Sequence, residues 1–189
     1  MGQAKTLTES EFKRLLKVVS VERYGPRNRI VILLGHWAGM RVGEIAALKI
    51  GDVLNQDGTI KDTINLKSEQ TKGSNARTVH LPSKLQDELA SFVRTQRGRL
   101  ADPLITSQKS RSGFDANSLC SAVKHWYELA GIGNGSSHSG RRTFLTKLAS
   151  QGVSARVLQE LAGHKNLATT QRYIDVNDDM KRSAVELAI

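Results

Sequence analysis

One change of pattern along the chain most constrains its fold. Between about residues 53 and 82 the sequence loses the helical spacing of apolar residues that flanks it on both sides. Asn55-Gln56-Asp57-Gly58 is typical of a tight turn, and Pro82 closes the segment. The stretches expected to be extended are 53–54 with 59–60, 64–66 and 78–81. A small antiparallel sheet inside a helical chain is therefore predicted.

Helical patterns fill the rest of the chain. Thr8 and Glu11 have the spacing of a capping box, and Pro26 suits the first turn of a helix. Several later segments repeat apolar residues at three- and four-residue spacing. Helices are expected to begin near Thr8 and Pro26 and to occupy 43–48, 84–97, 116–130, 142–150, 155–162, 167–173 and 178–188. The predicted fold class is α+β, mostly α-helical with a small three-stranded antiparallel sheet.

The charge of the chain indicates what it binds. Its 28 Lys and Arg against 18 Asp and Glu give a net charge of +10, which favours a polyanion: nucleic acid first, an acidic membrane surface second. Cys120 is the only cysteine, so an intrachain disulfide is excluded and the pattern is typical of an intracellular protein. The longest apolar run, 30–34, is too short to span a bilayer. A soluble protein of the cytoplasm, associated with the nucleoid, is expected.

Two arginines have the surroundings of phosphate ligands. Arg41 lies in an apolar neighbourhood, and a guanidinium is rarely buried without an anionic partner. That partner is either Glu44, one helical turn away, or a phosphate that Arg41 clamps while Glu44 holds it. Arg141 is expected at a helix start, where the helix dipole favours an anion, three residues after His138.

Three further side chains extend this set. Lys72, beside Gly73 at the expected hairpin tip, is either a charged turn residue or a lysine on a finger that reaches into a groove. His164 follows Gly163 between two short helices, and Tyr173 follows at a helix end. Two arginines, two histidines and a tyrosine without a carboxylate cluster make a poor metal site. They suit a site that grips a phosphodiester and attacks it with a tyrosine hydroxyl.

The order and spacing of these elements resemble the catalytic domain of the tyrosine recombinases, the phage-integrase and Xer-type family. The resemblance covers nearly the whole chain, from about residue 6 to 189. It rests on Gly39-Met40-Arg41-Val42-Gly43-Glu44, Thr71-Lys72-Gly73 with Arg77 to Pro82, His138 with Arg141, Leu161 to His164, and Thr169-Thr170-Gln171-Arg172-Tyr173. Each element alone is weak, and all five in order make a specific signature. Gly140 and Arg142 depart from the usual His-x-Leu-Arg-His pattern, which leaves the local packing there to be explained.

The resemblance implies a mechanism. The implied catalytic residues are Arg41, Lys72, His138, Arg141, His164 and Tyr173. Tyr173 is expected to attack a DNA phosphodiester and form a 3′-phosphotyrosyl link, while Arg41 and Arg141 bind the nonbridging oxygens. Glu44 is expected to support Arg41. The other expected roles are proton acceptor for His138, proton donor to the leaving 5′-oxygen for Lys72, and hydrogen-bond donor to the phosphate for His164.

The same resemblance implies the partners and the cofactors. Double-stranded DNA is the expected substrate, with Arg77, Lys109 and Arg111 on its backbone. A homotetramer on DNA and accessory DNA-bending proteins are the other expected partners, and no membrane is. No cofactor is expected, because the covalent link keeps the phosphoester energy without metal or ATP.

The domain plan and the activity each leave alternatives open. Residues 1–176 are expected to form the catalytic domain and 177–189 a tail helix, which docks on a neighbouring protomer or folds back on its own domain. Many family members carry a helical DNA-binding domain before this one, so the chain is either an excised fragment or a short, single-domain member. Two other activities remain: a regulatory DNA-binding protein with the recombinase fold, and topoisomerase-like nicking and resealing.

Overall fold

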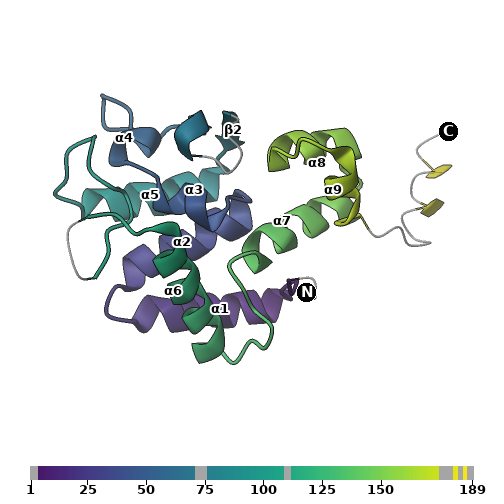
Figure 1. Cartoon of the computed structure of the whole chain (residues 1–189), viewed down its shortest axis with the longest axis horizontal. Helices are drawn as coiled ribbons and strands as arrows, with labels where there is room; N and C mark the ends of the chain where they lie inside the picture. The colour runs from purple at the N-terminus through teal and green to yellow at the C-terminus, as the bar shows by residue number, and fades with distance from the viewer. Residues whose placement is uncertain (1–3, 71–75, 109–111, 175–180, 183–184, 187–189) are drawn as a thin grey trace.

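The computed structural model describes residues 4–70, 76–108, 112–174, 181–182 and 185–186. Its elements are α1 (Glu9–Val21), α2 (Gly25–Trp37), α3 (Val42–Ala46), α4 (Ile50–Val53), β1 (Thr63–Leu66), the 3-10 helix η1 (Ser68–Gln70), β2 (Arg77–His80), α5 (Ser83–Arg94), α6 (Ala116–Leu129), α7 (Ser139–Ser150), α8 (Ala155–Ala162) and α9 (Leu167–Gln171). The mostly helical fold with one small antiparallel sheet confirms the predicted fold class (Figure 1).

Local signals set several helix ends as expected. At the start of α1 the Glu11 amide donates to the Thr8 hydroxyl at 3.3 Å, and the Thr8 amide donates to the Glu11 carboxylate at 3.0 Å, which completes the capping box. Helix α8 begins after Ser154, whose side chain caps it. Helix α7 begins at Ser139 rather than at Arg142, so Arg141 lies inside its first turn.

The sheet has two strands among the described residues, so the prediction of a third strand was wrong. Strands β1 and β2 pair antiparallel, with Ile64 opposite Val79. The expected third strand is reduced to a single bridge between Leu54 and Ile60, which closes the turn. The physical reason is length: α4 occupies the chain up to Val53, so no extended segment can form before the turn.

The described residues form two apolar cores. The larger core takes its buried side chains from α1 to α6, the sheet and the loops between them. The smaller core consists of Leu145 and Ala149 of α7 with Leu158 and Ala162 of α8, and Tyr173 packs against it. Figure 1 shows α7 leading away from the larger body toward α8 and α9, with α8 lying beside β2. The two cores therefore meet where α7 packs against α2 and where the end of α8 approaches β2.

Some sequence predictions fall outside the described residues. Lys72, Lys109 and Arg111 belong to this group, as does most of the expected tail helix 178–188. The described parts of that tail, 181–182 and 185–186, are helical. In the portion of the chain that the structure describes, no helix has the length and apolar character needed to cross a bilayer.

Candidate active site

Glu44 is the centre of an arginine cluster where the two cores meet. Its side chain is 1% exposed, and burial without partners would raise its pKa. The hydrogen bonds and charge of Arg77, followed by those of Arg41, outweigh that effect, and they hold the pKa of Glu44 below its usual value. Arg77 Nε and Nη2 donate to the two carboxylate oxygens at 3.1 and 2.6 Å, while Arg41 donates through Nη1 at 2.9 Å and its backbone amide at 2.7 Å. The carboxylate therefore accepts four bonds and stays ionised.

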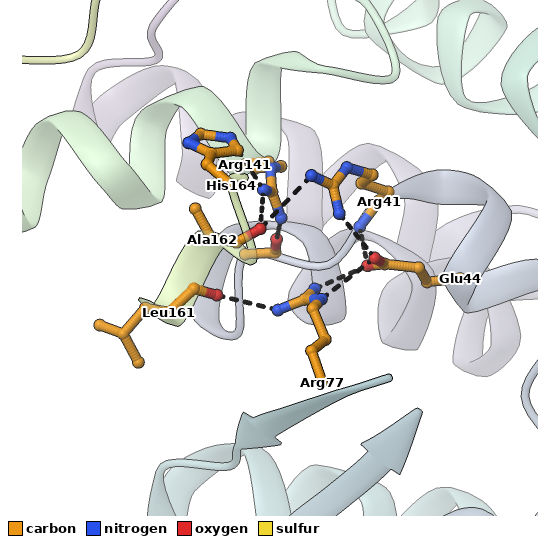
Figure 2. Close-up of polar contacts among 8 residues, drawn as sticks. Arg41, Glu44, Arg77, Arg141, Leu161, Ala162 and His164 are labelled. Atoms are coloured by element: carbon orange, nitrogen blue, oxygen red, sulfur yellow. Dashed lines mark hydrogen bonds and ion pairs between the residues drawn. The ribbon is translucent and has the colours of Figure 1, made fainter. Parts of the chain in front are cut away.

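The C-terminal carbonyls of α8 form a second meeting point for the guanidiniums. Arg77 Nη1 donates to Leu161 O at 2.8 Å, Arg41 Nη2 lies 3.4 Å from Ala162 O, and Arg141 Nη2 also donates to Ala162 O (Figure 2). These carbonyls lie at the negative end of the helix dipole, where cations are stabilised. The end of α8 thus gathers three arginines that come from three different parts of the sequence.

Arg141 is the most enclosed of these arginines. It is 5% exposed, and Nη1 donates to Gly39 O at 2.7 Å. Burial, together with the charges of Arg41 and Arg77, lowers the pKa of Arg141 to about 9, so it is still a cation at neutral pH. Three guanidiniums and the single carboxylate of Glu44 leave two net positive charges in the cluster. A site with that excess favours an anion such as a phosphodiester.

His164 is held in one protonation form by its neighbours. Burial, then the charges of Arg141, Arg41 and Arg77, lower the pKa of His164 to about 4, so the ring is neutral at pH 7. Its Nε2 lies 3.2 Å from Arg141 Nη2, and a guanidinium can only donate, so Nε2 accepts. The ring proton is then on Nδ1, which donates to Thr170 Oγ1 at 3.0 Å.

Tyr173 lies at the edge of this cluster, just past the end of α9. Its ring stacks on His164 with centroids 5.8 Å apart and an interplanar angle of 19°. The guanidinium of Arg142 lies 5.7 Å from the centre of the Tyr173 ring. The guanidinium of Arg141 instead points into the buried cluster. The half-buried phenol is therefore placed beside the arginines, and Arg141 rather than Arg142 belongs to them.

The first turn of α7 explains why glycine occupies position 140, where the usual His-x-Leu-Arg-His pattern has leucine. His138 is the exposed residue that precedes the helix. A Cβ placed on Gly140 would lie 2.9 Å from His36 Cδ2 and 3.1 Å from the backbone carbon of Gly35. The buried His36 therefore occupies the space that a larger side chain at position 140 would need, which lets α7 lie close against α2.

Comparison with known proteins identifies the arrangement. The model of the phage integrase family matches residues 5–180 of the chain. The chain belongs to the phage integrase family. Its fold is that of a tyrosine recombinase catalytic domain: a crystal structure of XerA recombinase superposes with a TM-score of 0.76 at 27% identity, covering 100% of this chain and 66% of that one.

Relatives in the phage integrase family come from archaea and bacteria. The tyrosine recombinase XerA of Thermococcus kodakarensis is 34% identical over 185 residues, which are 97% of this chain and 62% of the relative. XerD of Neisseria meningitidis is 31% identical over 176 residues, 90% of this chain and 58% of the relative. A crystal structure of XerH bound to a palindromic difH substrate, a post-cleavage complex, has a TM-score of 0.72 at 25% identity, covering 98% of this chain and 53% of that one. The chain thus spans about 60% of the length of such relatives.

Two residues of the cluster, Arg77 and Thr170, were not predicted to belong to it. Arg77 was expected on the DNA backbone, whereas the Arg77 side chain is 7% exposed and donates from three nitrogens to Glu44 and Leu161. The sequence does indicate the position of Arg77. It lies two residues before the buried Val79 on the same strand, so both side chains face inward. Thr170, fully buried against His164, has no such signal in the sequence.

Proposed function

We propose that the chain is the catalytic part of a site-specific DNA recombinase or integrase that cleaves DNA with Tyr173. The single observation that carries the proposal is the placement of Tyr173 against His164, beside a cluster with two excess positive charges. A phenol next to a cluster of positive charge is the arrangement that attack on a phosphodiester needs. Membership of the phage integrase family supports the same chemistry.

The proposed reaction exchanges one phosphoester for another. Tyr173 Oη attacks the phosphorus, the bond to the 5′-oxygen breaks, and a 3′-phosphotyrosyl link forms. Arg41 and Arg141 stabilise the charge on the nonbridging oxygens, because their guanidiniums are already oriented by fixed acceptors. His138 takes the phenol proton, and Lys72, outside the described residues, gives a proton to the leaving oxygen. Attack by the 5′-hydroxyl of another strand reverses the steps and completes exchange without metal or ATP.

The cluster also suggests how His164 takes part. In the described arrangement Nε2 accepts from Arg141, so it has no proton to give to a phosphate. The hydroxyl of Thr170 can donate as well as accept. When a phosphate takes over the N–H of Arg141, a shift of the ring proton from Nδ1 to Nε2 lets His164 donate to the phosphate while Thr170 donates to Nδ1.

The partners follow from the proposed reaction. We expect double-stranded DNA as substrate, four copies of the chain in the complex that exchanges strands, and accessory DNA-bending proteins at some sites. XerH was crystallised on a difH substrate, which supports DNA as the partner of this chain too. The expected location is inside the cell, on the nucleoid, where that substrate is.

The test is capture of the covalent intermediate. A nicked duplex, or one with a 5′-bridging phosphorothiolate, traps the protein on DNA, and a denaturing gel resolves the complex. Wild type and the control Tyr24→Phe should give the band, while Tyr173→Phe should not. Loss of the band in the control, or its persistence in Tyr173→Phe, would contradict the assignment.

Bands without strand exchange, combined with relaxation of supercoiled plasmid, would favour topoisomerase-like activity. Binding without any band would favour a regulatory DNA-binding protein.

A further inference from the structure

We infer that Arg77 is a positioning residue whose role is to neutralise Glu44, so that the charge of Arg41 stays available to the phosphodiester. The inference rests on the proposed function, which assigns Arg41 to the phosphate. It gives Arg77 a role inside the protein, in place of contact with the DNA backbone.

The geometry separates the two arginines that share Glu44. Arg77 makes the two-pronged contact, with Nε and Nη2 on the two carboxylate oxygens at 3.1 and 2.6 Å. Arg41 uses one guanidinium nitrogen, Nη1, at 2.9 Å. A bidentate pair of this kind is the stronger of the two contacts. Arg77 is therefore the main counter-ion of Glu44.

Exposure points the same way. The side chain of Arg77 is 7% exposed and that of Arg41 is 25% exposed. With its N–H groups on Glu44 and Leu161, Arg77 is enclosed, whereas Arg41 keeps a face open to a ligand. Arg77 can therefore act on a bound phosphate only through its effect on Arg41.

The net charge of the cluster depends on Arg77, which gives this residue a function. With Arg77 present, the pair Arg77–Glu44 is neutral, and Arg41 and Arg141 contribute two positive charges. Without Arg77, Glu44 would pair with Arg41 alone, and only the charge of Arg141 would remain uncompensated. Beside side chains as buried as Glu44 and Arg141, one charge strongly affects a transition state that gains negative charge.

The backbone explains how Arg77 reaches this place. It is the first residue of β2, and its side chain passes beneath the turn that ends α8. A Cβ on Gly163, which has φ of 58°, would lie 2.6 Å from Arg77 Cδ. Only glycine both adopts that backbone conformation freely and leaves room for the arginine stem. The contact thus ties the sheet to the turn that carries His164.

The experiment uses a charge-compensating pair of variants. Arg77→Met should slow formation of the covalent DNA complex by about tenfold to a hundredfold, less than or similar to direct loss of an oxyanion donor. Glu44→Gln added to Arg77→Met should recover at least half of that loss on a logarithmic scale, because Arg41 is freed again. Arg77→Lys, which keeps the charge but not the fork, should fall between wild type and Arg77→Met. The double variant and Arg77→Met are compared at equal melting temperature. Slower formation of the covalent complex by the double variant would show a merely structural role of Arg77 and overturn the inference.

A second measurement does not depend on cleavage. Carboxyl ¹³C NMR of Glu44 against pH should show that Arg77→Met raises its pKa more than Arg41→Met does. A larger effect of Arg41→Met would overturn the inference. If wild type forms no covalent complex, the proposed function fails, and this titration still decides whether Arg77 is the main counter-ion of Glu44.

Discussion

Acidification from pH 7 to pH 5 should destabilise the domain through one buried histidine, His36. It lies in α2 with 6% exposure, its Nε2 is 2.9 Å from Tyr127 Oη, and the ring of Phe12 is 4.6 Å away between centroids. Burial lowers the pKa of His36 from 6.5 to about 3. The same burial raises the pKa of Tyr127 above its usual value, so both partners are neutral.

Proton linkage gives the sign and the size of the change in the free energy of unfolding. The unfolded chain binds a proton on His36 as the pH falls through 6.5, while the folded chain does not until about 3. Between these values the unfolded state holds one more proton, so stability is lost as the pH falls. A full proton difference changes the free energy of unfolding by about 1.4 kcal/mol per pH unit, which amounts to about 2 kcal/mol between pH 7 and pH 5. His164 adds to the loss, but its partial exposure reduces its share.

The assay is urea unfolding of wild type and His36→Gln at half-unit steps from pH 7 to pH 5. The difference between their pH dependences isolates His36, because every other titrating group is shared. Tyr127→Phe is the matched control: it removes the hydrogen-bond partner but keeps the histidine buried, so it should retain the pH dependence of wild type. Equal pH dependence in wild type and His36→Gln would refute the reasoning.

Three further predictions concern the proposed active site and the proposed DNA-binding surface. Gly163→Ala should cost about 1–2 kcal/mol of stability from the left-handed backbone alone, measured by urea unfolding, with a larger loss in DNA cleavage. Thr170→Val should leave the Nδ1–H of His164 without an acceptor at a cost of about 1–3 kcal/mol, and Thr170→Ser should restore both the melting temperature and the two-bond ¹H–¹⁵N pattern of the ring. Lys109→Ala and Arg111→Ala should each make the slope of log Kd against log salt concentration shallower by about one, and unchanged slopes would exclude those residues from the DNA backbone.

Local structure was predictable where local chemistry decides it. The start of α1 follows from the capping box of Thr8 and Glu11, and α8 occupies the expected residues because Ser154 caps it and Gly163 ends it. The start of α7 was placed three residues late because Ser139 and the glycine after it are weak helix formers; packing against α2 decides that turn.

The site itself was predictable only as a set of residues. Arg41, Arg141, His164 and Tyr173 follow from the order of motifs, and the structure brings them together at the end of α8. The sequence does not contain the reason they meet, because a helix end has no residue signature for the guanidiniums that come to it from distant segments. The inward position of Arg77 is the exception, since strand alternation indicates it.

The meeting of three guanidiniums at the end of α8 places the proposed active site at a seam between the two cores. Leu161 O, Ala162 O and the Glu44 carboxylate accept the hydrogen bonds that join the two sides at this point, while α7 also packs against α2. Free guanidinium ion is the same chemical group as the arginine side chain and competes for the same acceptors. Dilute guanidinium chloride should therefore weaken these hydrogen bonds before it unfolds the chain, and sodium chloride of equal ionic strength should weaken them less. DNA cleavage should then be lost reversibly at a guanidinium concentration well below the one that unfolds the protein.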